Sequence, residues 1–181
     1  MNRRDALELL HEYTKSKNLI KHALAVEVAM KDYARIFKED EDLWQIVGLL
    51  HDFDYEAYPE EHPNKGKEIL EKRGVAPNII DAIQAHAEFT GVLRDTLLKK
   101  AIFAVDELTG FIVAVSLVQP NKSLSEVTVN SVKKKLRQKG FARQVKRDDI
   151  IKGAKELDQS LEEHIGNVLK SMQTISNKLE L

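Results

Sequence analysis

Cysteine is absent from the 181-residue sequence. Its absence excludes disulfide bonds, thiolate zinc sites and cysteine nucleophiles. Any metal must therefore be bound by imidazole and carboxylate groups. Such ligands suit Fe, Mn, Co, Ni or Zn in a site open to water better than they suit a structural zinc.

An excess of charge of one sign is also lacking, because the formal net charge is -1. The sequence thus offers no overall electrostatic attraction for nucleic acid or an anionic membrane.

A long uninterrupted apolar run is missing as well. The most apolar stretch, 101–118, contains Asp106 and Glu107, and a bilayer span would not carry two adjacent acids without a special reason. The N-terminal residues lead into a charged amphipathic stretch, which differs from the apolar core of a signal peptide. We therefore expect a cytoplasmic protein with no membrane partner.

The alternation of apolar and polar residues that marks β-strands is scarce, whereas nearly every segment shows helical periodicity. The composition, 43% hydrophobic and 31% charged, is that of an ordinary globular protein. The length suits one domain. We predict an all-α fold in a single domain, 1–181, in which a C-terminal helical extension, 121–181, packs on the front half.

Capping residues, glycines and prolines mark the expected helix ends. The predicted helices are one capped by Asn2 and ending near Tyr13, one capped by Asn18, and then 41–50, 64–73, 77–89, 94–119, one starting at Asp148 or Asp149, and 160–179. The segment 53–63 lacks periodicity, contains two prolines and is expected to be a loop over the site. The helix 94–119 is the most apolar and is predicted to be central.

Histidine and aspartate residues recur on or just after these predicted helices. The ordered set consists of His22, His51, Asp52, His62, His86 and Asp106. A helical bundle can point all of these side chains to one place, and imidazole and carboxylate ligands that leave a position for water are what a metal-dependent hydrolase needs. A lone histidine on an apolar helix face is usually a hydrogen-bonded core residue. Asp106 is harder to explain in this way, because burying its carboxylate without a partner would cost several kcal/mol.

The order of these residues resembles the HD superfamily of metal-dependent phosphohydrolases. The matching positions are His22, the pair His51-Asp52, and the distant Asp106. The context is also similar, since Gly48 to Asp52 resembles the apolar helix that ends in the HD pair, and 104–110 resembles the segment around the last aspartate. The resemblance covers about 18–120 and implies an HD-domain-like helical bundle. It also implies hydrolysis of a small phosphate ester or nucleotide, by attack of a metal-bound hydroxide at phosphorus.

Some members of that superfamily have two further histidines that bind a second metal ion, and His62 and His86 occupy such places. The resemblance thus implies a site for two divalent transition-metal ions in which Asp52 bridges the pair. Other subfamilies place Lys or Glu three residues after the Asp of the pair, where this sequence has Tyr55. Asp54 and Tyr55 are therefore only local candidates, Asp54 for proton transfer together with the catalytic Asp52, and Tyr55 for substrate contact. A solvated acidic loop is the simpler interpretation of Glu56.

Basic residues could contact the phosphate of a substrate. The candidates are Lys65, one turn after His62, and Arg143, in the basic segment 139–147. The same basic segment can equally be a solvated helix face. The expected partner is a small phosphorylated substrate; nucleic acid is not expected, and self-association into a homo-oligomer stays open.

Two other functions use the same residues. One is a di-iron oxygenase on an HD-type scaffold, because imidazole and carboxylate ligands suit iron in either role. The other is a non-catalytic regulatory domain that retains its metal. The complete ligand set argues against the second.

Overall fold

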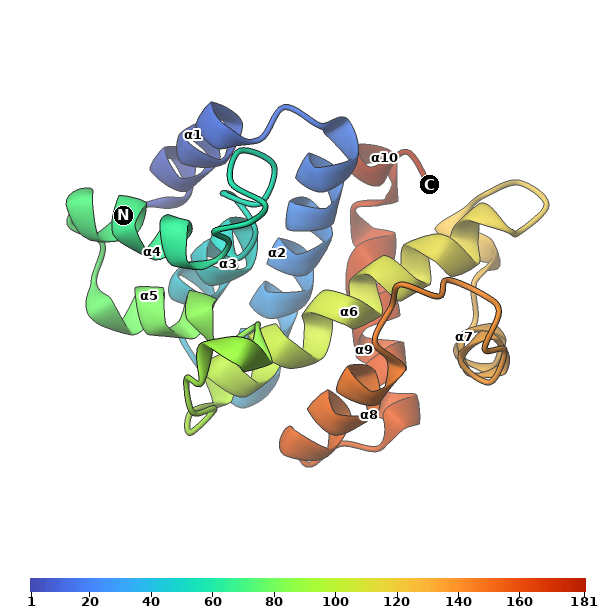
Figure 1. The fold of residues 1–181 in the computed structure, drawn as a ribbon. Helices are drawn as coiled ribbons and strands as arrows, with labels where there is room; N and C mark the ends of the chain where they lie inside the picture. The colour runs from blue at the N-terminus through green and yellow to red at the C-terminus, as the bar shows by residue number, and fades with distance from the viewer.

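The computed structural model describes all residues, 1–181, and is built entirely from helices (Figure 1). The fold is therefore all-α, as predicted. The α-helices in chain order are α1 (Arg3–Tyr13), α2 (Lys17–Phe37), α3 (Glu41–Leu50), α4 (Asn64–Lys72), α5 (Pro77–Gln84), α6 (Leu97–Leu117), α7 (Val129–Leu136), α8 (Arg147–Glu156), α9 (Leu161–Thr174) and α10 (Ser176–Leu179). Two short 3-10 turns, η1 (Glu88–Thr90) and η2 (Leu124–Glu126), complete the list. None of the helices combines the length and apolar character that crossing a bilayer requires.

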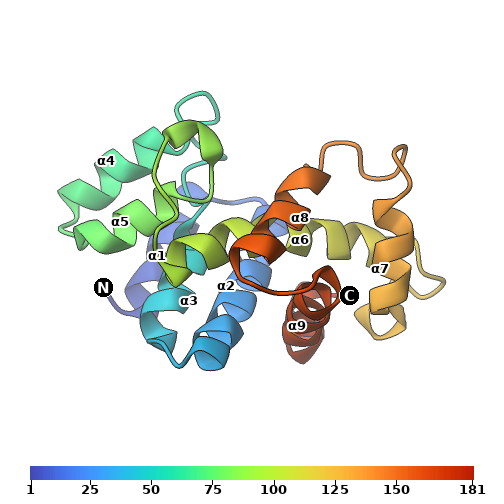
Figure 2. The ribbon, with the colours of Figure 1, turned by 90° about the horizontal axis from the view of Figure 1, so that it is seen from below.

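Helix α6 lies at the centre of the molecule. It runs across α2 and contacts α3, α5, α7, α8 and α9 (Figures 1 and 2). Most of its side chains are buried, which agrees with the apolar composition that predicted a central helix. One continuous apolar core extends from Ala6 in α1 to Leu179 in α10. The elements after Pro120 therefore share the core of the first half of the chain.

Helices α2 and α3 pack against each other at very short range. A side chain at Gly48 would place its Cβ atom 2.9 Å from the Cα atom of Glu27, so only glycine permits this approach. Three residues after Gly48, α3 delivers His51 beside α2. The close packing of two backbones thus fixes one of the candidate ligands relative to another helix.

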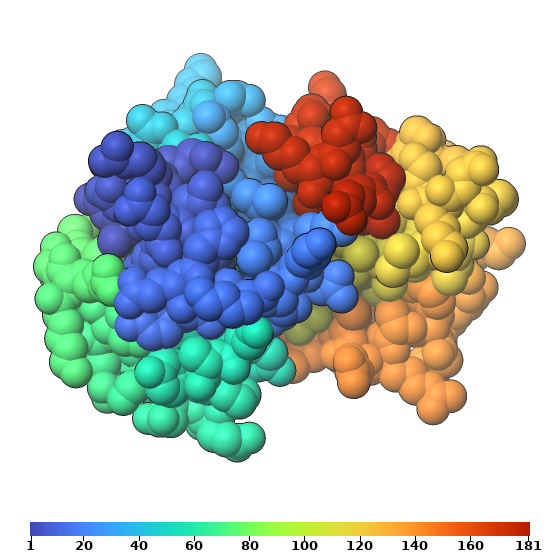
Figure 3. Space-filling view, turned by 90° about the horizontal axis from the view of Figure 1, so that it is seen from above, coloured from blue at the N-terminus to red at the C-terminus, as the bar shows by residue number.

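The C-terminal residues return to the first half of the chain. Seen from above, they lie against the start of α2 (Figure 3). Lys21 pairs with Glu180 at 2.5 Å, on the exposed edge of this contact. The helix predicted over 160–179 is in fact two helices, since α9 ends at Thr174 and α10 begins at Ser176.

Several other predicted helix ends differ from the structure by a few residues, and three of these errors have a clear cause. Helix α2 starts at Lys17 rather than after Asn18. The amides of Lys15 and Ser16 donate to the carboxylate of Glu56 at 2.8 and 2.9 Å. Glu56 therefore caps the start of α2 from a distant loop, whereas the sequence suggested only a solvated acid.

The two remaining errors flank η1. Helix α5 ends at Gln84 instead of near Phe89, because the Gln84 carbonyl accepts from the Thr90 hydroxyl at 3.0 Å. Helix α6 starts at Leu97, with Thr96 as its N-cap, rather than at Arg94. Arg94 instead donates to Glu156 of α8 at 2.7 and 2.8 Å. Both ends thus depend on contacts outside the predicted helix.

Candidate metal centre

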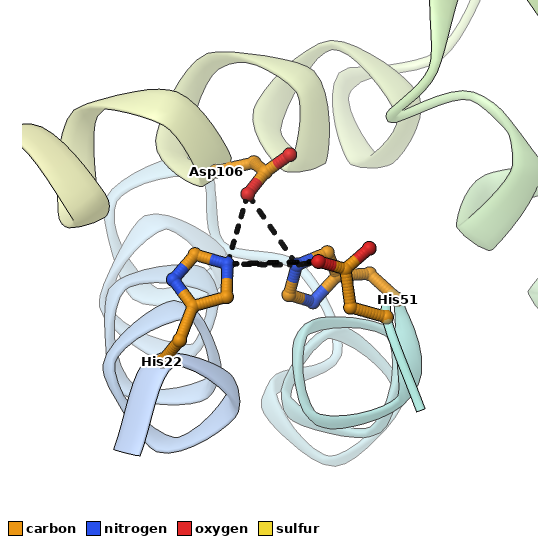
Figure 4. Close-up of side chains that lie close together, drawn as sticks. His22, His51 and Asp106 are labelled. Carbon is orange, nitrogen blue, oxygen red and sulfur yellow. Dashed lines mark hydrogen bonds and ion pairs between the residues drawn. The ribbon is translucent and has the colours of Figure 1, made fainter. Parts of the chain in front are cut away.

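Three long helices bring together the first group of candidate ligands. His22 comes from α2, His51 from the C-terminal end of α3 and Asp106 from α6, and their side chains point toward one another (Figure 4). The Nε2 atom of His22 lies 3.2 Å from Nε2 of His51 and 3.0 Å from Oδ1 of Asp106. The His51 Nε2 atom lies 3.4 Å from the same Asp106 oxygen and 3.5 Å from Oδ2 of Asp52. Four side chains thus offer a compact group of ligand atoms.

A second group of ligand atoms lies next to the first. It consists of His62, in the irregular segment before α4, and His86, just after α5, together with Asp52. The two histidine Nε2 atoms lie 3.2 Å apart. They lie 3.2 Å (His62) and 3.3 Å (His86) from Oδ1 of Asp52. Asp52 therefore turns one carboxylate oxygen toward each group.

The other ring nitrogen of every one of these histidines is occupied. Each Nδ1 atom lies beside an acceptor. Those of His51 and His86 face the carbonyls of Gly48 and Ile83 at 2.8 and 2.6 Å. That of His62 faces the Asp54 carboxylate at 2.8 Å, and that of His22 faces the Thr109 hydroxyl at 3.5 Å. A carbonyl or carboxylate oxygen only accepts, and the Thr109 hydroxyl already donates to the Asp106 carbonyl. Each Nδ1 atom therefore faces an acceptor, which leaves Nε2 as the ring atom turned toward the centre, where it can meet a metal ion or a further proton.

This donor set fits metal ions. Four Nε2 lone pairs and two carboxylates converge, and lone pairs only 3.2 Å apart cannot hydrogen bond to each other unless a proton or a cation lies between them. Ligand bonds of about 2.1 Å put neighbouring ligand atoms about 3.0 Å apart in an octahedral shell and about 3.4 Å apart in a tetrahedral one. The separations within the second group, and the shorter ones within the first, fall in that interval.

The close approach of these side chains also shifts their pKa values. Burial lowers the pKa of His51 and of His86, but the charge of Asp52 and Asp106 outweighs it and raises both values. Burial likewise opposes the charged form of His62, yet Asp52 and Asp54 raise its pKa to about 9. Burial raises the pKa of Asp52 and Asp106, but the neighbouring histidines bring both well below the usual range. The centre therefore attracts cations, whether protons or metal ions.

Asp54 lies behind His62, away from the cavity. It is only 1% exposed; one carboxylate oxygen lies 2.8 Å from the His62 ring, and the other accepts from the Gly66 amide at 2.7 Å. A Cβ atom at Gly66 would lie 2.9 Å from this carboxylate, so the glycine allows the contact. This placement favours a role in orienting His62 over the proton transfer expected for Asp54.

A cavity of about 290 Å³ opens beside the two groups. Its wall includes the ligand candidates Asp52, His62, His86 and Asp106, and further Tyr55, Ala87, Phe89, Phe103, Glu107, Lys146 and Asp149. Larger hollows of about 340 to 640 Å³ lie elsewhere, and among them only the one of about 340 Å³ contains a ligand candidate, His22 alone. The position of the ligand atoms, rather than hollow size, identifies the candidate substrate cavity.

The predicted substrate contacts are only partly at this cavity. Tyr55 lines it and packs edge-on against His62. Lys65 does not, since its ammonium group lies 3.2 Å from Glu68 and 3.7 Å from Glu61. Arg143 is exposed and lies outside the wall of the cavity. The basic residue that does line it is Lys146, three residues further along the same segment.

Two acids of the cavity wall were also not predicted. Glu107 and Asp149 line the cavity together with the ligand candidates. Burial, with nearby acids, raises the pKa of both carboxyl groups. The Glu107 carboxylate accepts from the Lys146 amide at 3.3 Å. Glu107 follows Asp106 directly and could have been suspected from the sequence. Lys146 belongs to the basic segment 139–147 that was expected to reach phosphate, whereas Asp149 was expected only as a possible helix start.

A comparison with protein families gives one match, the HD domain, over residues 19–110. The chain belongs to the HD domain family. The match spans just over half of the chain and includes all six candidate ligands. No curated protein and no solved structure matches the chain.

Membership confirms the resemblance inferred from His22, His51-Asp52 and Asp106. HD domains are all-α, and many are metal-dependent phosphohydrolases. The His/Asp cluster described above is compatible with the metal site of this family. The matched segment ends at residue 110, within α6, so the cavity residues Lys146 and Asp149 belong to the part of the chain beyond it.

Proposed function

We propose that this protein is a metal-dependent phosphohydrolase that acts on a small phosphate ester or nucleotide. The observation that carries the proposal is the convergence of six metal-ligand candidates beside a cavity, with the Nδ1 side of each histidine already occupied. His22, His51, Asp52 and Asp106 would hold one divalent ion, and Asp52, His62 and His86 a second. Fe, Mn, Co, Ni and Zn all suit this set. Bound ions of this kind supply a water molecule of lowered pKa and neutralise charge on the reacting phosphate.

The residues of the chain position the reactants. Asp52 belongs to both groups and would serve as a ligand in each. The Nδ1 contacts hold each ring in the tautomer that ligation requires. Asp54 acts through His62. Lys146, the only lysine or arginine in the cavity wall, has no carboxylate within ion-pair distance and is free to contact phosphate oxygens.

The test combines metal content with hydrolysis. Purified protein is analysed for bound metals, reconstituted with each of the five, and assayed on p-nitrophenyl phosphate, bis(p-nitrophenyl) phosphate and a set of nucleotides. We expect two ions per chain and metal-dependent release of phosphate or alcohol. His51→Gln should abolish activity, whereas His11→Gln, in an exposed histidine of α1, should not.

Two outcomes would overturn the proposal. A protein that binds no metal and stays inert after reconstitution is not a phosphohydrolase of this kind. Oxygen consumption that depends on iron, without hydrolysis under any metal, would assign the centre to oxygen chemistry instead.

A further inference from the structure

The segment between Glu126 and Asp148 contains no acidic residue but eight lysines and arginines. Three of these eight have partners within the protein. Lys133 pairs with Glu162, Lys135 lies 4.7 Å from the ring centre of Phe141, and Arg147 donates to backbone carbonyls. Lys146 lines the cavity. The remaining four are exposed and form no ion pair; we call Lys134, Arg137, Lys139 and Arg143 the cationic ridge.

The ridge is held in place by Arg147. All of the hydrogen bonds of the guanidinium go to backbone carbonyls of the segment that precedes it, namely those of Leu136, Gln138, Phe141, Ala142 and Val145. The segment 137–146 thus spans from the end of α7 to the start of α8 as a fixed loop (Figure 2). Its inner end, Lys146, lies in the cavity wall. The ridge is therefore continuous in the chain with the candidate substrate cavity.

None of the four ridge residues lines the cavity. A ligand confined to a cavity of about 290 Å³ would not touch them. A chain of phosphates that leaves the cavity could. Unpaired lysines and arginines, three on the fixed loop and Lys134 in the helix before it, are the groups that bind such a chain.

Two exposed aromatic side chains lie at the same cavity. Tyr55 is 45% exposed and Phe89 is 71% exposed, and both belong to its wall. The turn that carries Phe89 is tied to α8, because Glu88 pairs with Lys152 and with Arg94, which in turn pairs with Glu156. A lysine in the cavity wall, further cations along the chain from it and exposed aromatic rings at the same cavity form the combination that binds single-stranded nucleic acids, with phosphates on the cations and bases on the rings.

We infer that the substrate is the end of a single-stranded nucleic acid, with its terminal nucleotide in the cavity between Tyr55, Phe89 and Lys146, and its following phosphates on the cationic ridge. This inference rests on the proposed function for the reaction itself. It replaces the expectation, drawn from the net charge, that nucleic acid is not a partner. The fold adds two exposed aromatic residues, Tyr55 and Phe89, from elsewhere in the chain.

Binding is tested separately from hydrolysis, on the full-length protein stripped of metal with a chelator. The probe is a fluorescent oligothymidylate about twelve nucleotides long, followed by anisotropy over about 50 to 300 mM salt. The ridge variant combines Lys134→Gln, Arg137→Gln, Lys139→Gln and Arg143→Gln. Its matched control combines Lys38→Gln, Lys72→Gln, Lys170→Gln and Lys178→Gln, which are exposed, form no ion pair and lie on other elements.

We expect the ridge variant to bind at least tenfold more weakly. The slope of log K against log salt should fall by about 2 to 3, since each phosphate contact on a single strand contributes about 0.7. Phe89→Ala should weaken binding by about tenfold with little change in that slope, because stacking is not a charge contact. The matched control should bind like the wild type.

The inference fails if the wild type does not bind the oligonucleotide at low salt, or if the matched control loses as much affinity as the ridge variant. It also fails if a nucleoside triphosphate competes as well as the oligonucleotide, because the ligand would then be a small polyphosphate. Hydrolysis of bis(p-nitrophenyl) phosphate is measured on the metal-loaded protein. Failure of that reaction would count against the proposed function. The inference about binding would still be decided by the anisotropy measurements.

Discussion

The two groups of candidate ligands are built in different ways. The first group stands on the long helices α2 and α6 and the end of α3, where His51 is completely buried and Gly48 allows close backbone packing. In the second group, His62 and His86 lie outside regular helices and are oriented by Asp54 and by the Ile83 carbonyl. Helix packing thus determines the positions of the side chains in the first group, whereas local polar contacts determine the positions of most side chains in the second group. Substitutions should therefore affect the two groups separately, except at the residue that they share.

Asp52 is that residue, and its loss should have the largest effect. Asp52→Asn keeps the shape of the side chain but removes the charge offered to both groups. We expect both ions to be lost or greatly weakened and hydrolysis to fall by more than about 100-fold. Metal analysis after dialysis, with circular dichroism to confirm the fold, measures this. Retention of two ions would show that Asp52 does not bridge the groups.

Substitutions within one group should remove one ion. Asp106→Asn should lose the ion of the first group, and His62→Gln that of the second, so each variant should retain about one ion per chain. The same metal analysis distinguishes the two from Asp52→Asn. If either variant kept both ions, the ligand assignment for that group would be wrong.

Asp54→Asn tests whether local polar contacts determine the second group. The asparagine can still face His62 but without charge, so we expect the affinity for the second ion to fall by about 10- to 100-fold. The first ion should bind as before. A chelator titration that follows the release of each ion provides the measurement, and equal weakening of both ions would contradict the separation of the groups.

A smaller effect is expected from the packing behind the first group. His164 of α9 is fully buried, donates through Nε2 to the Ala104 carbonyl of α6 at 2.9 Å and contacts the Tyr33 hydroxyl at 2.6 Å. Burial lowers the pKa of His164 to about 4 from 6.5. Between these values the unfolded chain binds a proton that the folded chain does not. Stability from this group is therefore fully present above pH 6.5 and is lost as the pH falls toward 4.

The variant His164→Gln isolates this contribution. The difference in free energy of unfolding between the wild type and the variant should shrink by about 2 to 3 kcal/mol from pH 7 to pH 4. Urea unfolding of metal-free protein at several pH values measures it. A difference that does not change with pH would mean that His164 binds a proton as readily in the folded protein as in the unfolded chain.

Local signals in the sequence predicted much of the fold. Helix α3 matches the predicted range because Asp40 caps it and the HD pair follows its last turn. The errors at the ends of α5 and α6 have a different origin. Thr90 closes the end of α5, and Arg94 is held by Glu156, 62 residues away. The residue pattern near 84 to 97 gives no sign of the contact between Arg94 and Glu156.

At the candidate site, too, some residues could be predicted from the sequence, and others depend on how distant segments fold together. The structure brings all six predicted ligand candidates together, because their order in the chain resembles a family whose fold is known. Lys65 and Arg143 were chosen only by charge and proximity in sequence, and both lie outside the cavity wall. Lys146 could not be distinguished from its basic neighbours, since its position depends on how the loop before α8 is folded. Phe89 likewise becomes a cavity residue only because α5 ends early.

The contacts of Arg147 have one further consequence. The five N–H groups of its guanidinium match the five carbonyls that it meets in the segment 136–145. The segment has only a few hydrogen bonds among its own backbone groups, so this one side chain joins it into a single cooperative unit. Hydrogen exchange should therefore see these amides open together rather than one by one. A loop ordered before any ligand arrives also spares the complex the entropy of ordering it.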